Sequence, residues 1–392
     1  MGSFSEMSEL ELIATTGFGL EAVVARELKA LGYADQQVED GRVTFIGDEQ
    51  AICRTNLRLR SAERVLLKVG SFEARDFGEL FDRTIELPWA EWVDVDAAFP
   101  VRGKSVRSQL HSVPDCQRIV KKAVVESLKR IDGREWFEET GPAYGIEVSM
   151  LKDQATLTID TSGSGLHKRG YRTLSGAAPL KETLAAALVQ LSYWNPERTL
   201  VDPFCGTGTI PIEAALIARN IAPGLNRVFA AEEWPRIPPK LWVEARSEAR
   251  DEEREKPDVP IIATDLDEEV LSLARYHARR AGVEADIHFQ QKPIAEFTTQ
   301  RKYGCIICNP PYGERSGSLE QAEETYREMA RAFKGIDTWS LYVLTSHPEF
   351  ERLFGRRAER RRKLYNGRIA CTYFQYAGPR PPRRARVETS DD

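Results

Sequence analysis

Four consecutive residues, Asn309-Pro310-Pro311-Tyr312, directly follow the apolar run Tyr303–Cys308. Proline cannot continue a hydrogen-bonded ladder, so the run is predicted to be a buried strand that ends at Asn309. In open α/β sheets, ligands bind at the carboxyl ends of the strands. An amide, two prolyl carbonyls and an aromatic ring at that edge can hold an exocyclic amine of a nucleobase. The Asn309 oxygen and the Pro310 carbonyl would accept its hydrogens, and Tyr312 would stack on the base. A plain strand-to-loop turn is the alternative.

A second group of residues follows another predicted strand, Thr199–Asp202. Gly206 and Gly208 come next and would let the backbone approach a nucleotide-like ligand closely, before a helix over Ile210–Asn220. The turn is not a P-loop, because it has no Gly-Lys-Ser/Thr. It also departs from the dinucleotide fingerprint, since Pro211 stands where a third glycine is expected and no acid ends a strand about 20 residues on.

Two acidic residues indicate which ligand the glycine turn would hold. The next strand, Ile261–Thr264, is followed by Asp265, which could accept hydrogen bonds from both ribose hydroxyls. Asp202 suits a ligand with a cationic amino group, whereas a phosphate would be repelled by it. This combination favours S-adenosylmethionine over NAD. Asp265 could instead cap the helix predicted over Glu268–Arg280, and the two roles are compatible.

The remaining reactive side chains show no second site. Cys305 and Cys308 would point to opposite faces of a strand, so they can neither pair nor share a metal ion. The histidines lack ligand spacing, and we predict no metal. The scattered cysteines indicate a reduced, cytoplasmic protein; they lie at positions 53, 116, 205, 305, 308 and 371.

The net charge of −5 by itself argues against binding to nucleic acid. The distribution of the charges along the chain changes this conclusion. Between Arg352 and Arg386 there are twelve Lys and Arg residues and one acid, Glu359. Such local fields, rather than the net charge, attract a polyanion. The densest part of this segment is Arg356–Lys363. The alternative to RNA binding is that these side chains form a helix face that contacts only solvent. The candidate RNA contacts are Lys168, Arg169, Arg172, Arg356, Arg357, Arg361, Arg362 and Lys363.

Hydrophobic periodicity divides the chain into three regions. Residues 1–66 read as a βαββ-like, ferredoxin-like α+β unit, with strands at 10–14, 43–46 and 65–69 and helices at 18–31 and 51–59. Residues 67–165 contain two helices, at 77–87 and 115–131, and a hairpin whose strands 145–150 and 155–160 meet at Lys152-Asp153. Gly163-Ser164-Gly165 is predicted to be a short linker. From residue 166 onward strands and helices alternate, as in a parallel sheet, with an insertion over roughly 223–258.

Longer motifs then carry a family resemblance. In chain order they are LHKRGYR…APLKETLAAAL, DPFCGTGTIPIEAA, IARNIAPGLNRVFAAEEW, ATDLD, NPPYGER and RKLYNGRIACTYFQY. Together they resemble the THUMP-containing class I RNA methyltransferases. The most similar branch is that of the bacterial 23S ribosomal RNA guanine-N2 methyltransferases and their single-enzyme Gram-positive relatives. The resemblance covers residues from about 8 to 380.

The resemblance implies a ferredoxin-like domain over 1–66, an RNA-binding THUMP domain over 67–165 and a Rossmann-like catalytic domain over 166–380. The catalytic domain would have a seven-stranded, mostly parallel sheet that ends in an antiparallel strand, Ile369–Tyr376. The basic tail over 381–392 is expected to be disordered.

The resemblance also implies roles for individual residues. Asn309, Pro310, Pro311 and Tyr312 match the target-amine site. Members of the family often have an aspartate after the third strand that accepts from the adenine amino group. Here Pro293 stands in that place, and Gln291 or a backbone group is the expected substitute. The cofactor site comprises Asp202, Phe204, Gly206, Gly208, Thr209, Asp265 and Gln291.

Three functions follow as hypotheses. The first is methylation of a guanine N2 amine in 23S ribosomal RNA, with S-adenosylmethionine as cofactor and RNA or a pre-ribosomal particle as partner. The second keeps the reaction but changes the target to a transfer RNA guanine or a DNA adenine amine. The third is an RNA chaperone or assembly factor that binds the cofactor without chemistry, which the intact Asn309–Tyr312 motif disfavours.

Overall fold

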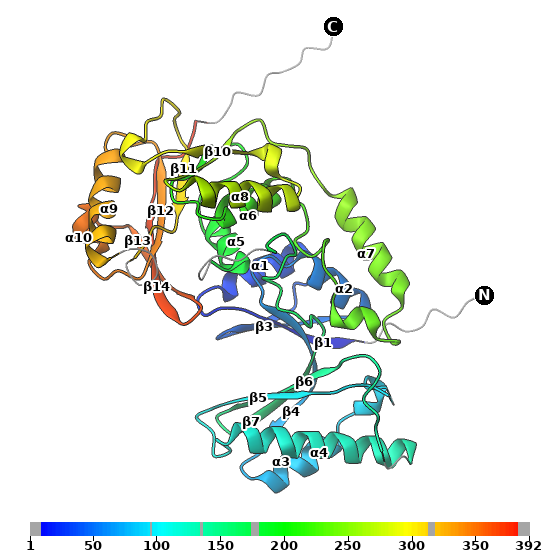
Figure 1. The fold of residues 1–392 in the computed structure, drawn as a ribbon. Helices are drawn as coiled ribbons and strands as arrows, with labels where there is room; N and C mark the ends of the chain where they lie inside the picture. The colour runs from blue at the N-terminus through cyan, green and yellow to red at the C-terminus, as the bar shows by residue number, and fades with distance from the viewer. Residues whose placement is uncertain (1–8, 95, 134–135, 174–179, 313–317, 383–392) are drawn as a thin grey trace. The chain divides into compact units, whose positions relative to one another are not determined.

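A computed structural model of the chain describes residues 9–94, 96–133, 136–173, 180–312 and 318–382. The chain divides into two compact units (Figure 1). Unit 1 consists of Met1–Gly170 and Asn220–Glu253, and unit 2 consists of Tyr171–Arg219 and Arg254–Asp392. The chain therefore leaves unit 2 after Arg219, contributes a segment to unit 1 and returns at Arg254. No helix in the described ranges is long and apolar enough to cross a membrane.

Unit 1 is built on a single sheet of seven strands. Their spatial order is β2 (Gln36–Glu39), β3 (Arg42–Gly47), β1 (Leu10–Thr15), β4 (Arg64–Glu73), β7 (Gln154–Asp160), β6 (Gly145–Leu151) and β5 (Val101–Val106). The α-helices that the described residues form before Gly133 are α1 (Glu21–Ala30), α2 (Glu49–Arg58), α3 (Phe77–Ile85) and α4 (Val113–Asp132). Every element predicted in residues 10–160 is present. Strands β2 and β5 were not predicted, because polar residues interrupt their apolar pattern.

Strand β4 joins the two halves of this sheet. Leu66 and Leu67 pair with β1 on one side, and the strand pairs with β7 on the other as far as Glu73. The boundary predicted between residues 66 and 67 therefore falls inside one strand. In the β6–β7 hairpin, Lys152 and Asp153 have φ values of 52° and 64°, as the type I′ turn of a two-residue hairpin loop requires.

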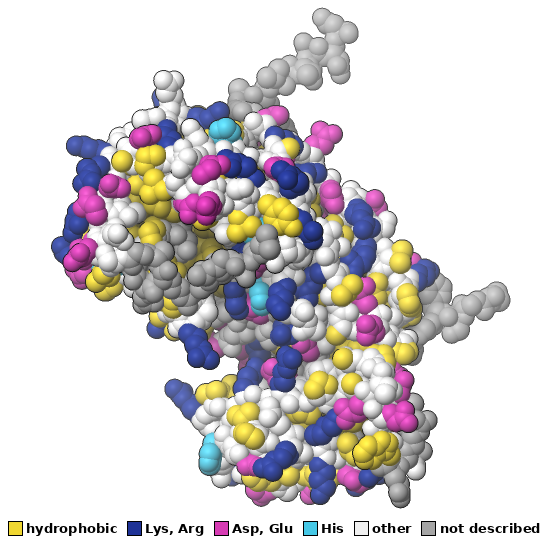
Figure 2. All heavy atoms as spheres, viewed as in Figure 1, with side chains coloured by type: hydrophobic (Ala, Val, Ile, Leu, Met, Phe, Trp, Pro, Cys, Tyr) yellow, Lys and Arg dark blue, Asp and Glu magenta, His cyan; other side chains and the backbone are white. Residues whose placement is uncertain are grey.

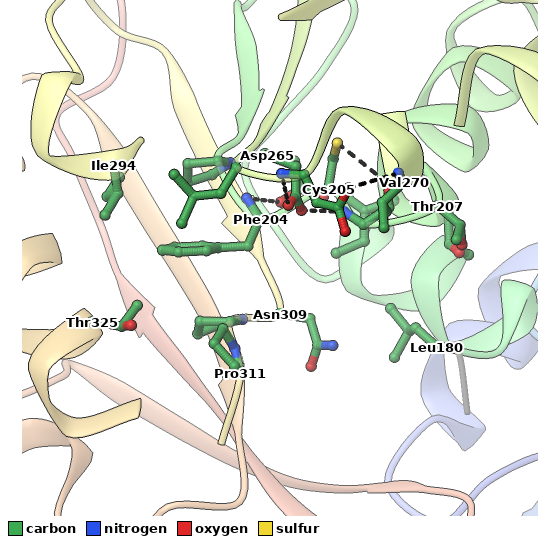
Figure 3. Close-up of a pocket in the computed structure, with 18 of the residues that line it drawn as sticks. Leu180, Phe204, Cys205, Thr207, Asp265, Val270, Ile294, Asn309, Pro311 and Thr325 are labelled. Atoms are coloured by element: carbon green, nitrogen blue, oxygen red, sulfur yellow. Dashed lines mark hydrogen bonds between the residues drawn. The ribbon is translucent and has the colours of Figure 1, made fainter. Parts of the chain in front are cut away.

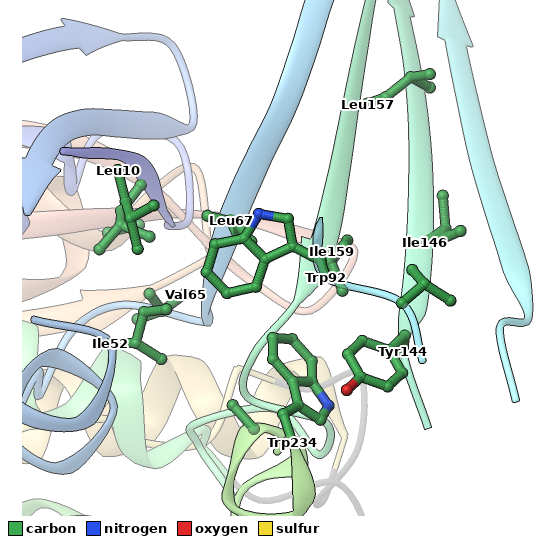
Figure 4. Close-up of a cluster of buried hydrophobic side chains, with 14 of the residues drawn as sticks. Leu10, Ile52, Val65, Leu67, Trp92, Tyr144, Ile146, Leu157, Ile159 and Trp234 are labelled. Atoms are coloured by element: carbon green, nitrogen blue, oxygen red, sulfur yellow. The ribbon is translucent and has the colours of Figure 1, made fainter. Parts of the chain in front are cut away.

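The insertion was predicted over roughly 223–258 of the catalytic domain, but most of it, within Asn220–Glu253, packs into unit 1. Trp234 is 1% exposed and stacks on Tyr144, with ring centroids 4.6 Å apart (Figure 4). Its helix α7 (Pro239–Asp251) lies against α2. The predicted linker Gly163-Ser164-Gly165 is also fixed, because the Arg227 guanidinium donates to the carbonyls of Ser164 and Gly165.

Ion pairs reinforce the contact between α2 and α7. Arg54 pairs with Glu248 at 2.9 Å, and Arg58 pairs with Glu252 at 2.6 Å. In the sequence Arg54 and Arg58 belong to a basic group, and Glu248 and Glu252 belong to an acidic run, so these two ion pairs neutralise part of both.

Unit 2 contains a second sheet of seven strands. Their spatial order is β10 (Ile287–Gln291), β9 (Ile261–Asp265), β8 (Leu200–Asp202), β11 (Cys305–Cys308), β12 (Ser340–Thr345), β14 (Ile369–Tyr376) and β13 (Arg360–Asn366). The first five are parallel, and β14 is antiparallel to β12. The helices are α5 (Glu182–Gln190), α6 (Thr209–Ala218), α8 (Glu268–Arg280), α9 (Leu319–Ala332) and α10 (Phe350–Phe354). The predicted mostly parallel sheet and its antiparallel strand are confirmed.

The helix face considered as the alternative for the dense basic cluster is not observed. Arg356 and Arg357 lie in the loop after α10, and Arg360–Lys363 belong to the edge strand β13. The tail predicted to be disordered lies outside the described residues from 383 onward.

Candidate active site

A cavity of about 510 Å³ lies at the carboxyl ends of the unit 2 strands (Figure 3). Asp202 at the end of β8, Asp265 at the end of β9 and Asn309 just after β11 all line it. The chain runs from β8 to β9 and β10 on one side of the sheet, then crosses to β11 on the other. The cavity therefore occupies the switch point of the strand order, where open α/β sheets bind ligands, and its volume suits a nucleoside-sized molecule.

Asp202 is the most deeply buried acid of the cavity. Its side chain accepts a hydrogen bond from the Phe204 N–H at 3.2 Å, and the residue is 1% exposed. Burial, with a smaller contribution from the nearby Asp265 carboxylate, raises the pKa of Asp202 well above its usual value. A ligand with a cationic amino group would relieve both effects.

This shift predicts a proton-linked affinity. Because a bound cation favours the charged carboxylate, ligand binding should lower the Asp202 pKa and release a proton at any pH between its free and bound values. S-Adenosylmethionine should therefore bind more tightly as the pH rises through that range. Calorimetry in two buffers of different ionisation enthalpy would measure the released proton. Asp202→Asn should abolish the release, and a wild-type binding heat that does not depend on the buffer would contradict the assignment.

The two glycines of the turn have different reasons for being glycine. A Cβ at Gly206, where φ is +51°, would meet no atom within 4 Å, and the residue lines the cavity, so its bare backbone leaves room for a ligand. A Cβ at Gly208 would lie 3.1 Å from the Cβ of Ala274 on α8. Gly208 is not among the residues that line the cavity, so we assign it to helix packing rather than to direct ligand contact.

Asp265 is held in place by backbone groups. Its Oδ2 accepts from the Gly206 N–H at 2.9 Å and its Oδ1 accepts from the Asp267 N–H at 3.2 Å. The cap of helix α8 is Asp267, which accepts from the N–H groups of Glu269 and Val270. The structure thus decides against Asp265 as the cap. A carboxylate has about four acceptor positions, so two remain for a ligand hydroxyl pair.

We expect Asp265→Ala to weaken S-adenosylmethionine binding by about 1.5–3 kcal/mol, the range for charge-assisted hydrogen bonds. Calorimetry would measure the loss, and circular dichroism would verify that the variant is folded. Asp267→Ala is the matched control: it removes a neighbouring carboxylate that caps α8, so it should lower stability more than affinity. Unchanged affinity in a folded Asp265→Ala protein would remove Asp265 from the site.

The four residues Asn309–Tyr312 line the cavity, and Asn309 and Pro311 lie across it from Asp265 (Figure 3). The Asn309 Oδ1 atom is buried and has no hydrogen-bond partner within the described chain. An unsatisfied buried acceptor costs about 1–3 kcal/mol, so its retention points to a donor supplied by a ligand. The Pro311 carbonyl is taken by the Tyr326 hydroxyl at 3.0 Å, whereas no described residue donates to the Pro310 carbonyl.

The other predicted cofactor residues divide into two groups. Phe204 and Thr209 line the cavity, and Thr209 accepts a hydrogen bond from Arg172. Gln291 does not line it, and one of its two amide N–H groups donates to the Leu266 carbonyl. Sequence reasoning missed Glu328 on α9, which lines the cavity together with Pro293. Glu328 lies 35 residues beyond Pro293, and no motif in the sequence indicates that the two residues line the same cavity.

The structure corrects part of the predicted RNA surface. Arg169 is 4% exposed and donates to the backbone carbonyls of Leu166 and Arg60. Arg172 pairs with Glu182 at 3.3 Å and is also largely buried. Neither guanidinium is available to a phosphate. Lys168 is exposed.

The basic cluster around β13 is exposed but partly neutralised. Arg356 pairs with Glu359 at 3.2 Å, and Arg361 pairs with Glu351 at 2.8 Å. Arg362 is half-buried. On the face that Figure 2 shows, Lys and Arg side chains are interleaved with Asp and Glu throughout. The exposed cations of the cluster that have no ion pair with described residues are Arg357, Arg360 and Lys363.

These three cations allow a salt test. If they contact phosphates, replacing all three with alanine should reduce the slope of log affinity against log salt by roughly two units, because fewer counterions are released on binding. Filter binding of total RNA across a salt series would measure the slope. The matched control removes three exposed cations that precede the amino ends of β11 and β12: Arg301, Lys302 and Lys334. Equal slopes in both variants would make the β13 cluster an ordinary solvated surface.

One cavity of this seven-stranded sheet is lined by a glycine turn, by Asp265 and by the Asn-Pro-Pro-Tyr motif. This combination defines a class I methyltransferase. Residues 169–375 match the family model described as an RMKL-like methyltransferase domain. The chain belongs to this family, and its cofactor is S-adenosylmethionine. Residues 11–66 match an RlmL ferredoxin-like domain and residues 74–160 match a THUMP domain, which confirms the predicted domain types.

Similar proteins cover nearly the full length of the chain. The protein named "Putative RNA methyltransferase YpsC" of Bacillus subtilis is 50% identical over 386 residues, 98% of this chain and 100% of that protein. The structure of a "predicted N6-adenine-specific DNA methylase" from Listeria monocytogenes has a TM-score of 0.90 at 50% identity, covering 95% of this chain and 97% of that one. SMU.472, "a putative methyltransferase complexed with SAH", has a TM-score of 0.90 at 43% identity, covering 96% and 100%.

Proposed function

We propose that this protein methylates the exocyclic N2 amine of a guanine in RNA, with 23S ribosomal RNA as the substrate. The observation that carries the proposal is the buried, unpartnered Oδ1 of Asn309 at the cofactor cavity. An amine is the donor that this acceptor fits, and the target base must leave its stack to reach it. The match to a THUMP domain in the same chain supports RNA as the polymer.

The chemistry asks little of the protein beyond positioning. S-Adenosylmethionine supplies an electrophilic methyl group when bound. Asn309 and the Pro310 carbonyl would accept the two amine hydrogens, which localises the nitrogen lone pair and stabilises positive charge as it develops. Tyr312 would stack on the base in place of its former neighbours. Asp202 and Asp265 would hold the amino group and the ribose of the cofactor.

Two substrates of the same chemistry compete with a ribosomal guanine. A transfer RNA guanine presents the same N2 amine. The adenine amine of DNA is named for the Listeria protein, whereas RNA is named for YpsC. The THUMP match favours RNA, and an Asn-Pro-Pro-Tyr motif alone cannot distinguish the amines. A chaperone without chemistry is disfavoured, because it would have no use for a buried, unpaired Asn309 oxygen.

Nucleoside mass spectrometry of RNA from a strain that lacks the gene tests the proposal. Loss of one N2-methylguanosine from 23S ribosomal RNA is the expected result. Loss from transfer RNA would move the substrate to the first alternative, and loss of N6-methyladenine from DNA would move it to the second. Unchanged RNA and DNA would refute the methyltransferase function. Adding the purified protein and S-adenosylmethionine to the RNA of that strain should restore the nucleoside.

A further inference from the structure

The buried amide of Asn366 contacts the proposed target-base site. Its Nδ2 atom donates a hydrogen bond to the Tyr312 hydroxyl at 3.0 Å, and the residue is 4% exposed. Asn366 ends β13, 54 residues after Tyr312, so only the fold brings the two together. Because rings that stack on a base must be held at a defined angle, a fixed hydroxyl would set the plane of the Tyr312 ring.

The hairpin that carries Asn366 extends beyond the sheet. Thr345, the last residue of β12, pairs with Thr372, whereas Asn366 pairs with Ile369 three residues further out. At about 3.3 Å per residue the hairpin therefore overhangs β12 by roughly 10 Å. Strand β12 is parallel to β11, which leads into Asn309. The overhang consequently lies at the same edge of the sheet as the cavity.

The overhang exposes side chains that suit RNA. Tyr365 in the overhang is 38% exposed, and the ammonium of Lys363, which is level with the end of β12, lies 5.6 Å from the centre of its ring. Arg368, in the turn next to Gly367, is exposed and has no ion pair or hydrogen bond with described residues. An aromatic ring and cations on one projecting strand can contact the base and the phosphates of a single-stranded nucleotide.

We propose that Asn366 is a positioning residue for Tyr312, and that the β13–β14 overhang contacts the RNA strand next to the target base. This inference rests on the proposed function. It adds that the β13–β14 overhang forms one side of the site that holds the target base. Tyr312 touches the base, whereas Asn366 acts only through Tyr312. Arg368 acts on the strand and not on the reacting atoms.

A double-mutant cycle tests the positioning role. Tyr312→Phe and Asn366→Ala each remove the hydrogen bond and leave the ring, so each should lower kcat about fivefold, the effect of one ordinary hydrogen bond. The double variant should lose no more than either single one. The substrate is total RNA from a strain that lacks the gene, with labelled S-adenosylmethionine as methyl donor. Cofactor affinity should stay the same in all three proteins.

Independent losses that multiply in the double variant would overturn the positioning role, as would an unchanged kcat in Asn366→Ala. A purely structural role would lower thermal stability and cofactor affinity alongside kcat. A wild-type protein that transfers no methyl group to this RNA would refute the proposed function itself, so the two failures are distinguishable.

Arg368→Ala tests the strand contact. We expect KM for RNA to rise about fivefold with kcat unchanged, because a phosphate contact is made equally in the ground and transition states. Arg301→Ala, which removes an exposed cation before the amino end of β11, is the control and should change neither constant. An unchanged KM in Arg368→Ala would overturn the contact.

Discussion

Asn309→Ala is expected to lower methyl transfer by at least about 100-fold, the scale observed when one electrostatic group at a reacting centre is removed. The Asn309 oxygen is buried and has no partner among the described residues, and its loss would leave the Pro310 carbonyl to accept only one of the two amine hydrogens. The amine would keep its lone pair delocalised into the base. Single-turnover transfer to RNA from a strain that lacks the gene would measure the loss.

Cofactor binding should separate from chemistry in this variant. We expect S-adenosylmethionine affinity to remain near the wild-type value, since Asp202 and Asp265 are unchanged. Thr325→Ala is a matched control, because Thr325 lines the same cavity but its hydroxyl donates to the Gln321 carbonyl of its own helix. It should leave transfer nearly intact. Near-normal turnover in Asn309→Ala would exclude Asn309 as the amine acceptor.

The second large effect concerns the division of labour between the two units. A fragment of residues 171–378, with 220–253 replaced by a short glycine linker, should bind S-adenosylmethionine, because every residue that lines the cavity lies within it. The linker is feasible since the Arg254 N–H donates to the Arg219 carbonyl at 2.7 Å. Affinity for RNA should fall roughly 100-fold or more if the THUMP domain of unit 1, matched over residues 74–160, captures the RNA.

The design of this fragment depends on the insertion. A fragment of residues 166–380 keeps Phe229, Trp234 and Trp242, each at most 3% exposed in unit 1. Without unit 1 their apolar surfaces would face water, so we expect that fragment to aggregate. Filter binding and calorimetry on the shortened fragment decide the question. If it binds and methylates RNA as well as the full chain, unit 1 has no role in RNA capture.

The sequence by itself determined where the strands at the site end. Pro310 ends the strand that includes Cys308, and Gly206 permits the tight turn after Asp202. Both signals lie within a few residues of the structure they produce. Asp265 is likewise the last residue of the strand that places it. Local signals of this kind are enough to predict where the ligand site lies and which cofactor it binds.

Tertiary structure decided which partners those residues have. The choice of Asp267 over Asp265 as helix cap, and the packing of Gly208 against Ala274, depend on coordinates rather than on residue types. Arg54 pairs with Glu248, 194 residues away in the sequence, so its charge is neutralised. Arg169 is buried, so its guanidinium is not accessible to RNA. Asn366 reaches Tyr312 only because β13 lies at the edge of the sheet and overhangs it. Charge and burial depend on neighbours that are distant in sequence, so a single sequence names these residues without revealing what they contact.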